Sequence, residues 1–323
     1  MTLRAGLDVG GAHLKVALVE NGSVHTVRQF VCPLWKGLHT LKVALDEAAP
    51  LLSQAHEYAL TMTGELSDFF PNRATGVTSL LQHIERSLGS NIRVWMGTRG
   101  FGTLSQAHEA TPHVGSTNFL ATATYLARHI PEALFVDFGS TTVDIRQKAG
   151  ELSYTGYTRT ALMAVTTKAP FKGEWVSLAR EYLATMADVR RIIGCDLNDV
   201  DLHETADGKD KSLLSSQQRF ARMFGRDTEE GSEDDWHISA LFVREEQIKS
   251  ILDGIFLVLS GVPLAPTAPL IGAGSGESEI HDIARRLGKS FLSFSSVLSC
   301  PTALKKMAST CAPAVSVALL SEI

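Results

Sequence analysis

Cysteine is scarce in this chain, and no paired cysteine motif occurs. The 323 residues include four cysteines, which are scattered and form no CxxC pair: Cys32, Cys195, Cys300 and Cys311. This pattern argues against a disulfide scaffold or a zinc site and favours a reduced, cytoplasmic protein. The first strand is expected to start almost at Leu3, without a charged and then apolar leader, which agrees with that location.

The sequence also lacks a membrane-length apolar run and an excess of positive charge. A membrane-spanning helix needs about 20 consecutive apolar residues. The richest apolar window, ILDGIFLVLSGVPLAP, is interrupted by Asp253, Gly254 and two prolines. The formal net charge is −5, from 30 Lys and Arg against 35 Asp and Glu. We therefore expect neither a membrane nor a nucleic acid as a partner, since anionic partners favour a basic surface.

Several common enzyme motifs are missing. The chain has no GxSxG elbow and no HExxH zinc motif. The GKS at 288–290 does not complete a phosphate-binding loop, because Ile283 stands where the first glycine is required. The GAGSG at 272–276 does not complete the GxGxxG fingerprint of dinucleotide binding. Serine hydrolases, zinc proteases and dinucleotide enzymes are thereby disfavoured.

The length predicts two domains, and the patterning predicts a mixture of strands and helices. Asn21-Gly22 separates two apolar runs and is the strongest short signal for a hairpin. Strands are expected at 3–11, 14–20, 24–30, 57–64, 92–97, 268–273 and 290–298. Within 133–158 three strands are expected, separated by an Asp-x-Gly turn and a short Gly turn. Helices are expected at 40–52, 76–89, 116–130, 174–194, 238–261, around 280–288, and at 302–320 with an interruption near Pro313.

Two Asp-x-Gly turns occur in matched contexts along the chain. Each follows an apolar strand and leads directly into a second strand. At a constant offset of 129 positions the turns align residue by residue: Asp8 with Asp137, Gly10 with Gly139, and Lys15 with Asp144. Two such turns roughly a domain apart predict two similar lobes that face each other across a cleft.

The first turn combines the residues that phosphate binding requires. Gly10 and Gly11 allow successive backbone N–H groups to converge on an anion. Asp8 would hold Mg²⁺, directly or through water, and Lys15 would neutralise charge on phosphate oxygens. The alternative is a tight hairpin with a buried capping aspartate.

The second turn is more specific. Ser140, Thr141 and Thr142 add hydroxyl donors to the exposed amides. Carboxylates flank them at Asp137 and Asp144, and Asp144 is a candidate general base or water-mediated metal ligand. A β-hairpin needs neither the hydroxyls nor the two acids, so this turn favours the functional interpretation.

A third glycine-rich turn lies between a strand and a helix. Its glycines are Gly272, Gly274 and Gly276, and a nucleotide or other phosphate group could bind there at the helix N-terminus. By contrast, residues 196–237 are polar, and the run DTEEGSEDD at 227–235 holds six acidic residues in nine. We interpret 196–237 as a solvated insertion or mobile loop and assign the acidic run no role.

In this order, GLDVGG…K, VDFGSTTVD and LIGAGSGE resemble the phosphate-1, phosphate-2 and adenosine motifs of the acetate and sugar kinase, heat-shock ATPase and actin superfamily. The chain is similar to its hydantoinase/oxoprolinase group. TMTGELSD, STNFLATATYLA, EYLATMADVRRI, TADGKDK and QRFARMFGRD resemble a narrower family, the methanofuran/methylofuran biosynthesis transferases, or tetrahydromethanopterin-linked C1-transfer pathway proteins. The resemblance implies an α/β fold of two ribonuclease-H-like lobes, 1–115 and 116–323, with the C-terminal helix packing back on the first lobe.

The resemblance also implies an activity and a set of cofactors. Such an enzyme joins an aminomethylfuran, carried as a methyl diphosphate, to the phenol oxygen of a tyramine or tyrosine derivative and releases diphosphate. Mg²⁺ bound by Asp8, Asp137 and Asp144 would stabilise the departing charge. The phenol has an unperturbed pKa of about 10, so a carboxylate base would help, in the order Asp144, Glu65, Asp188. A homodimer is a further possibility.

The family motifs place further residues near the cleft: Thr63, Glu65, Asn118, Asp188, Asp207 and Lys209. For Asp188 the alternative is a solvated helix face, and for Asp207 and Lys209 a surface loop. The same turns would serve an ATP-dependent small-molecule kinase, a lactam-opening enzyme of the hydantoinase/oxoprolinase type, or a nucleotide-binding scaffold without catalysis.

Overall fold

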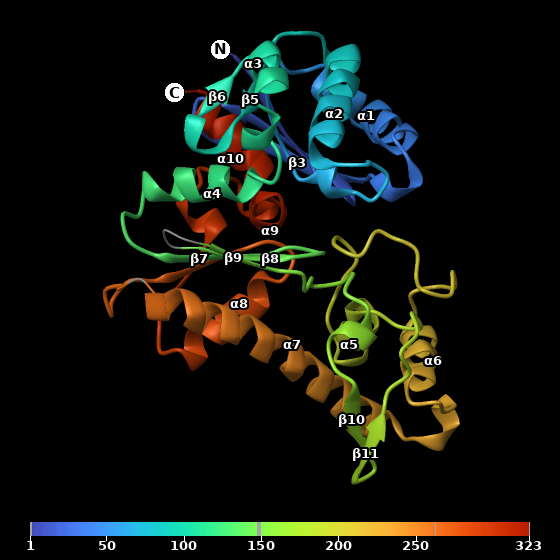
Figure 1. The fold of residues 1–323 in the computed structure, drawn as a ribbon. Helices are drawn as coiled ribbons and strands as arrows, with labels where there is room; N and C mark the ends of the chain where they lie inside the picture. The colour runs from blue at the N-terminus through green and yellow to red at the C-terminus, as the bar shows by residue number, and fades with distance from the viewer. Residues whose placement is uncertain (1, 147–149, 262, 323) are drawn as a thin grey trace. The chain divides into compact units, whose positions relative to one another are not determined.

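The computed structural model describes residues 2–146, 150–261 and 263–322. The chain forms two compact units, shown in Figure 1. Unit 1 consists of Met1–Glu132 and Ser293–Ile323, and unit 2 of Ala133–Leu292. The expected strand connection at 147–149 lies outside the described residues.

Unit 1 is built on a six-stranded sheet of order β3-β2-β1-β4-β5-β6. Its strands are β1 (Arg4–Val9), β2 (His13–Glu20), β3 (Ser23–Val31), β4 (Glu57–Met62), β5 (Ile92–Trp95) and β6 (Phe101–Gly102). β1 is antiparallel to β2 and parallel to β4. Asn21 and Gly22 have φ values of 52° and 73°, so both are left-handed, as a two-residue hairpin turn requires. The predicted hairpin is confirmed.

Helices cover the sheet of unit 1. They are α1 (His39–Leu52), α2 (Arg73–Leu88), α3 (Leu104–Glu109), α4 (Asn118–Ala127), α9 (Lys305–Thr310) and α10 (Ala312–Ser321). α10 is buried along its whole length and contacts β1, β2, β4 and α4. The contact with β1 is close, since a Cβ on Gly6 would lie 2.0 Å from the Ala314 carbonyl oxygen.

Strand alternation determines which face of β1 carries its polar residue. Ala5, Leu7 and Val9 belong to the hydrophobic core that includes α1 and α2. Successive side chains of a strand point to opposite faces, so Gly6 and Asp8 face the other side. That side is the one covered by α10 and α4, which brings Asp8 next to the beginning of α4.

Unit 2 contains a five-stranded sheet of order β13-β12-β7-β8-β9. Its strands are β7 (Leu134–Phe138), β8 (Val143–Arg146), β9 (Gly150–Ser153), β12 (Leu270–Ala273) and β13 (Phe291–Ser293). β7 is antiparallel to β8 and parallel to β12, and β8 is antiparallel to β9. The helices α7 (Glu233–Gly261) and α8 (Glu277–Arg286) pack against this sheet.

The two sheets share one topology around a central strand. β3-β2-β1-β4-β5 in unit 1 corresponds to β9-β8-β7-β12-β13 in unit 2. In both, the central strand has an antiparallel meander on one side and a parallel strand on the other. The predicted pair of similar α/β lobes is confirmed by this repetition.

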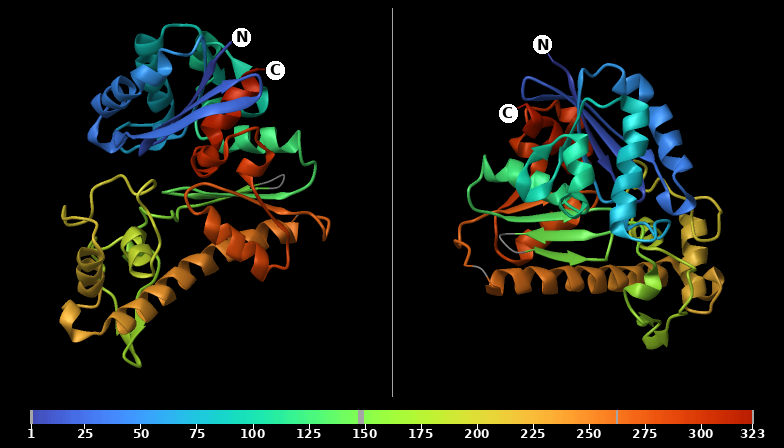
Figure 2. Two further views of the ribbon diagram at one scale, coloured as in Figure 1. Left: turned by 180° about the vertical axis from the view of Figure 1, so that it is seen from behind. Right: turned by 45° about the horizontal axis from the view of Figure 1, so that its top comes forward.

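Unit 2 also holds a part outside its sheet, residues 154–237, which we call the α5–α6 region. Its elements are β10 (Lys168–Phe171), β11 (Glu174–Ser177), α5 (Met186–Ile192) and α6 (Leu213–Met223). α7 contacts β8 and β9 as well as β10 and α5, so this one long helix connects the sheet to the α5–α6 region (Figure 2).

The predicted helix at 174–194 is wrong over most of its length. Its first residues form strand β11, which pairs with β10 through a turn at Lys172 and Gly173. Both turn residues have left-handed φ values of 50° and 81°, a conformation that produces a tight hairpin. The helix begins only at Met186, after the N-cap residue Thr185. The apolar spacing across 174–194 therefore matched a helical period by coincidence.

The interpretation of 196–237 as a solvated or mobile segment is also wrong. The segment contains α6, and Phe220 and Trp236 are buried in a hydrophobic cluster with Phe171. The acidic run has a local explanation. Part of it caps a 3₁₀ turn, η6 (Thr228–Glu230), and the rest forms the first turn of α7, where the helix dipole favours negative charge. The burial of a few large aromatic residues thus stabilises a folded structure in a mostly polar segment.

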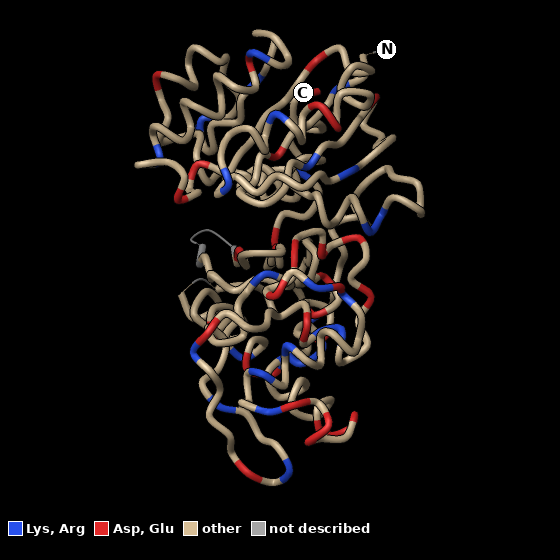
Figure 3. Tube along the Cα trace, turned by 90° about the vertical axis from the view of Figure 1, so that its right-hand side faces the viewer, with Lys and Arg blue, Asp and Glu red and all other residues tan. Residues whose placement is uncertain are grey.

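Charges of both signs are interspersed through unit 2 rather than gathered by sign (Figure 3). Across 2–146, 150–261 and 263–322, no helix combines the length and the apolarity that crossing a membrane would need.

Candidate active site

The two matched turns are built in the same way. In the first, the Gly10 N–H donates to the His13 carbonyl at 2.9 Å. In the second, the Gly139 N–H donates to the Thr142 carbonyl at 3.0 Å. Both donors and both acceptors are separated by the offset of 129 that aligns the sequences, because 139 − 10 and 142 − 13 are both 129. The sequence repeat is therefore a repeat of hydrogen-bonded structure.

The strand registers place a charged pair beside each turn. Asp8 lies opposite Lys15 across β1 and β2, and Asp137 lies opposite Asp144 across β7 and β8. Directly opposed residues of an antiparallel pair project from the same face of the sheet. Unit 1 therefore pairs an acid with a base at the position where unit 2 pairs two acids.

Asp8 is a buried carboxylate with cationic and amide neighbours. Its Oδ2 lies 3.8 Å from Lys15 Nζ, and its Oδ1 lies 3.5 Å from Asn118 Nδ2 at the beginning of α4. Burial raises the pKa of Asp8, and the opposing effects of Lys15 and Asn118 are smaller. Thr61 is opposite Asp8 on β4, and within the described chain its buried hydroxyl has no hydrogen-bond partner. The sequence interpretation missed Thr61.

Glu65 lies next to the first turn and is almost fully buried, at 1 % exposure. Ser116 Oγ donates to its Oε1 at 2.6 Å, whereas its Oε2 has no partner among the residues described. Burial raises the pKa of Glu65 and outweighs the opposing effects of the Ser116 hydrogen bond and of Arg73, which lies 3.7 Å from Oε1. Gly64 fits so tightly that a Cβ there would lie 3.2 Å from the Gly10 carbonyl oxygen.

Unit 1 therefore brings its predicted residues together. Asp8, Lys15 and Asn118 are linked by the contacts above, and Glu65 follows Gly64, which packs on Gly10. Thr63, which follows β4, lies beside this turn, since a Cβ on Gly10 would be 3.8 Å from Thr63 Oγ1. Gly11 has open space around it, which leaves room beside the backbone for a ligand.

The second turn is supported from behind by residues 156–159. The Tyr157 N–H donates to Gly139 O at 2.9 Å, and the Arg159 N–H donates to Ser140 O at 3.0 Å. A Cβ on Gly156 would lie 2.1 Å from Ser140 O, so only glycine allows this approach. The backbone of Gly139–Thr142 is thereby held in one conformation, with Asp137 largely buried beneath it.

Arg159 adds a cation to the second turn that the sequence interpretation missed. Its Nη1 donates to Thr141 Oγ1 at 3.2 Å. Burial lowers the pKa of the Arg159 guanidinium, since desolvation disfavours its charged form. The sequence offered one signal for this role, namely that Arg159 stands three residues after Gly156, just beyond the third strand of the repeat. Arg159 in unit 2 supplies the positive charge that Lys15 supplies in unit 1.

The third turn packs directly on the second. A Cβ on Gly274 would lie 2.4 Å from Asp137 Oδ1, and Gly274 has a left-handed φ of 87°. The Gly276 N–H donates to Phe138 O at 2.8 Å, and α8 begins at the next residue. Gly272 is needed for a different reason, because a Cβ there would press on the Phe291 ring at 2.8 Å.

Asp188, Asp207 and Lys209 lie in the α5–α6 region. Asp188 is buried, so its alternative as a solvated helix face is wrong. Its Oδ1 lies 2.8 Å from Arg219 Nη2, and its Oδ2 accepts the Thr185 N–H at 3.0 Å. These contacts join α5 to α6. The base role implied for Asp188 stays a prediction.

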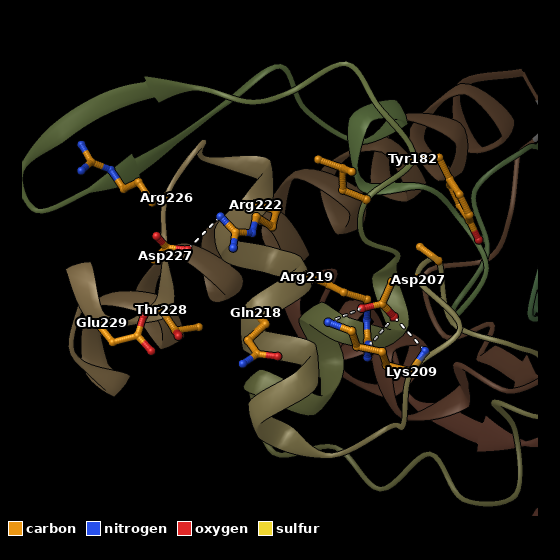
Figure 4. Close-up of a pocket in the computed structure, with 12 residues that line it drawn as sticks. Tyr182, Asp207, Lys209, Gln218, Arg219, Arg222, Arg226, Asp227, Thr228 and Glu229 are labelled. Carbon is orange, nitrogen blue, oxygen red and sulfur yellow. Dashed lines mark hydrogen bonds and ion pairs between the residues drawn. The ribbon is translucent and has the colours of Figure 1, made fainter.

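Asp207 also binds Arg219, with Oδ1 at 3.0 Å from Nη1. Lys209 is exposed, with its Nζ 3.9 Å from Asp207 Oδ2. Both line a cavity of about 360 Å³ (Figure 4). The backbone links α5 to the second turn in two steps, since the Ala187 N–H donates to Thr158 O and the next residue, Arg159, donates its N–H to Ser140 O, at 3.0 Å each.

The carboxylates present suit magnesium. No group of three or more His, Cys, Asp or Glu side chains in the described ranges could by itself enclose a metal ion. Magnesium does not need such a cage, because it binds through one or two carboxylates together with water and substrate phosphates. The opposed Asp137 and Asp144 on one face of the sheet meet that requirement.

No family model matches the chain. One curated relative, from Methanocaldococcus jannaschii, is 28 % identical over 251 residues, which is 71 % of this chain and 74 % of the relative. It is named a (4-{4-[2-(gamma-L-glutamylamino)ethyl]phenoxymethyl}furan-2-yl)methanamine synthase.

Solved structures of low sequence identity resemble this chain in fold. Nucleotide-free acetone carboxylase is 10 % identical with a TM-score of 0.56, and the match covers 89 % of this chain and 68 % of that one. A ROK family glucokinase from Streptomyces griseus, in complex with glucose and AMPPNP, is 13 % identical with a TM-score of 0.49 over 98 % of both chains. The first match and the repeated sheet topology confirm the predicted fold, the two-lobed α/β type of acetate and sugar kinases, heat-shock ATPases and actin.

Proposed function

We propose that this chain is a biosynthetic transferase that joins an aminomethylfuran, carried as its methyl diphosphate, to the phenol oxygen of a tyramine or tyrosine derivative. The observation that carries the proposal is the similarity to the archaeal synthase, whose name describes a phenoxymethyl-furan product. That product contains an ether between a phenol oxygen and a furan-bound methylene carbon, which is the bond this reaction would make. The narrower assignment to the hydantoinase/oxoprolinase group stays a prediction.

The reaction balances with two substrates and two products. The phenol oxygen forms a bond to the methylene carbon, and the bond from that carbon to the diphosphate oxygen breaks. The electron pair leaves with diphosphate, and the phenol proton passes to a carboxylate. The furan ring can spread the positive charge that develops at the reacting carbon, so stabilisation of the leaving group is the main task of the protein.

In unit 1, Lys15 and the turn amides would bind diphosphate oxygens. The Lys15 ammonium lies 3.8 Å from the buried Asp8 carboxylate, on the strand that follows the turn. The open space at Gly11 would let phosphate oxygen approach the backbone N–H groups. Asn118 and Thr63 would position the substrate.

In unit 2, the hydroxyls of Ser140, Thr141 and Thr142 and the Arg159 guanidinium would bind anionic oxygen. The hydrogen bond from Arg159 to Thr141 shows that the cation reaches this turn. Asp8, Asp137 and Asp144 would hold Mg²⁺, which when bound would neutralise charge on the leaving diphosphate. That the two turns bind one diphosphate together stays a prediction.

We assign the general base to Glu65 in preference to Asp144 and Asp188. The Glu65 Oε2 is buried and has no partner in the described chain, so it can accept a proton without breaking an existing contact. Burial raises its pKa toward the working range of a general base. Asp188, in contrast, is already bound by Arg219.

An ATP-dependent kinase or lactam-opening enzyme is the second candidate function. One observation favours it, namely that the third turn packs on Asp137 and leads into the N-terminus of α8. Backbone N–H groups at a helix N-terminus bind phosphate, and Gly274 has no side chain that would block the approach to the N-terminus of α8. Under this alternative ATP would be the cofactor.

Two measurements separate the candidates. Thermal unfolding with Mg²⁺ and diphosphate should raise the midpoint more than Mg²⁺ and ATP, since a ligand of the folded state stabilises it by mass action. Incubation of the aminomethylfuran methyl diphosphate with tyramine conjugates should release diphosphate in step with ether formation. ATP consumption without diphosphate release from the furan would refute the transferase and support the kinase.

A further inference from the structure

The middle of α7 carries a buried glutamine whose side chain is fully hydrogen-bonded. Gln247 is 1 % exposed. Its Nε2 donates to Thr155 Oγ1 at 2.8 Å and to Gly156 O at 2.9 Å. Its Oε1 accepts a hydrogen bond from Arg190 Nη2 of α5 at 2.8 Å. One side chain therefore joins α7 and α5 to the segment 155–156 within unit 2.

The chemistry of its partners allows this amide only one orientation. A guanidinium has donors and no acceptor, and a backbone carbonyl has acceptors and no donor. The Gln247 oxygen must therefore face Arg190, and its nitrogen must face Gly156. A flipped amide would set donor against donor at one end and acceptor against acceptor at the other. Arg190 thus determines the direction in which Gln247 holds the Gly156 carbonyl.

Gly156 lies directly against the second turn. A Cβ on Gly156 would be 2.1 Å from Ser140 O. The Gly156 N–H donates to Thr160 Oγ1 at 2.6 Å, so side chains hold both of its backbone polar groups. The next residue, Tyr157, donates its N–H to Gly139 O at 2.9 Å. A shift of Gly156 would therefore move the backbone that binds Gly139 and Ser140.

Arg190 reaches the same segment by a second contact. Its guanidinium carbon lies 4.0 Å from the centroid of the Tyr157 ring. Its side chain is completely buried, and Glu279 balances its charge at 3.6 Å. A cation–π contact is stronger where water is excluded. Two neighbouring residues are therefore held together, Gly156 by Gln247 and Tyr157 by Arg190.

Stability alone does not account for a charged group at this place. Within the described residues, Arg190 Nε and Nη1 have no hydrogen-bond partner. A buried donor without a partner costs stability, and well-packed apolar side chains often replace a buried ion pair without loss. Apolar residues do pack around this part of α7, as Ile248 and Ile251 show. A buried polar network that costs stability is expected where it fixes a functional geometry.

We propose that Gln247 and Arg190 are positioning residues for the second turn as a diphosphate site. Gln247 holds the Gly156 carbonyl, and Arg190 orients Gln247 and supports the Tyr157 ring. Both act on a bound diphosphate only through 156–159, the segment that supports the turn and carries Arg159 to it. The inference rests on the proposed function, because that function makes the second turn a diphosphate site.

The experiment compares two variants of α7. Gln247→Met removes every hydrogen bond of the Gln247 side chain and keeps a side chain of similar length. Ser239→Ala is the matched control, since Ser239 is fully buried and its Oγ donates to Pro170 O of β10 at 2.6 Å. The two positions are eight residues apart, since 247 − 239 is 8, or about 12 Å along the helix. Both variants therefore lose a buried hydrogen bond to a backbone carbonyl, and only Gln247→Met loses one beside the second turn.

Calorimetric titration with Mg²⁺ and inorganic diphosphate, below the unfolding transition, gives the first result. We expect Gln247→Met to weaken diphosphate binding by about tenfold, the effect of one charge-assisted hydrogen bond lost when the turn and Arg159 shift. Ser239→Ala should bind diphosphate as the wild type does, even where its midpoint of thermal unfolding falls as far. Unchanged binding by Gln247→Met, or equally weakened binding by Ser239→Ala, would overturn the inference.

Hydrogen exchange tests the positioning role without a ligand. The Tyr157 and Arg159 N–H groups, which bind the second turn, should exchange faster in Gln247→Met than in Ser239→Ala, relative to Val136 of β7 as the reference for opening of the sheet. If the wild type binds no diphosphate, the proposed diphosphate site fails, and these exchange rates still decide whether Gln247 holds the turn. Equal exchange in the two variants would refute the positioning role.

A milder variant covers the case in which Gln247→Met does not fold. Thr155→Val removes only the hydroxyl that accepts from Gln247 Nε2 and keeps the shape of the side chain. It should weaken diphosphate binding by about threefold and speed the exchange of the Tyr157 N–H, because one of the contacts of Gln247 is lost. Wild-type binding together with wild-type exchange in Thr155→Val would then refute the inference.

Discussion

Two ion pairs of equal length but different exposure allow the effect of burial on stability to be measured, with Asp188 as the buried acid. Arg219 and Asp188 are 2.8 Å apart with both side chains 2 % exposed, whereas Arg222 and Asp227 are 2.8 Å apart with more than half of each side chain exposed. Replacement of the acid by its amide, as Asp188→Asn and as Asp227→Asn, changes one charge at each place. The difference between the two variants therefore measures burial together with the contacts of Asp188 with Thr185 and Arg191.

The expected magnitudes follow from the surroundings of each arginine. Removal of one partner from a buried ion pair destabilises a protein by roughly 3–5 kcal/mol, because an uncompensated charge stays buried. Arg219 keeps the Asp207 carboxylate at 3.0 Å, so the lower end of that range, about 3 kcal/mol, applies to Asp188→Asn. For the exposed pair the loss should be below about 1 kcal/mol.

Thermal unfolding measures the difference. Unit 2 spans 133–292, or 160 residues since 292 − 133 + 1 is 160, and for domains of that size 1 kcal/mol shifts Tm by roughly 2–4 °C. Asp188→Asn should then lower the Tm of unit 2 by roughly 6–12 °C, several times the shift in Asp227→Asn. Equal shifts in the two variants would refute the reasoning from burial.

The same variant tests the role of Asp188 in catalysis. If Asp188 only joins α5 to α6, the kcat of Asp188→Asn, measured below its unfolding transition, should stay within about threefold of the wild-type value. A loss of about a hundredfold or more would instead show that Asp188 is the general base.

Three further outcomes are expected. Asp137→Ala should abolish turnover with an unchanged circular dichroism spectrum, and wild-type turnover would exclude a metal role for Asp137. Burial holds the pKa of Glu65 above its ordinary value of 4.5, so its contribution to stability is complete below pH 4.5 and is lost as the pH rises through the raised pKa. Glu65→Gln should remove that loss, which denaturation midpoints from pH 4 to 8 would detect, and an unchanged pH dependence would show that Glu65 is not the group responsible. Gly274→Ala should destabilise the chain by about 2 kcal/mol or more. A left-handed φ alone disfavours alanine by roughly 1–2 kcal/mol, and the added Cβ would also overlap Asp137 Oδ1. Wild-type stability of this variant would show that the third turn can move away from Asp137.

The turns could be predicted because their chemistry is local. Asn21-Gly22 formed its hairpin, and the offset of 129 that aligns Asp8 with Asp137 reappears in the hydrogen bonds of Gly10 and Gly139. Glycines, hydroxyls and flanking acids within a few residues favour such a turn, and residues 156–159 then support the second turn through hydrogen bonds to Gly139 and Ser140.

The failures have a common cause. The apolar spacing of 174–194 agreed with a helix, but two left-handed residues at Lys172 and Gly173 reversed the chain first. The polar composition of 196–237 hid Phe220 and Trp236, which pack on Phe171 far away in the sequence. Periodicity and composition describe a segment alone, and here the partner of the segment decided its structure.

The local sequence specified the two matched turns and the strands and glycines that form them, because glycines, hydroxyls and acids a few residues apart favour such turns. The residues that surround those turns became known only from the tertiary structure. It placed Arg159 on Thr141, buried Glu65 beside the first turn, and bound Asp188 to Arg219. Burial and ion pairing depend on residues that are distant in the chain, and no local pattern of residues shows them.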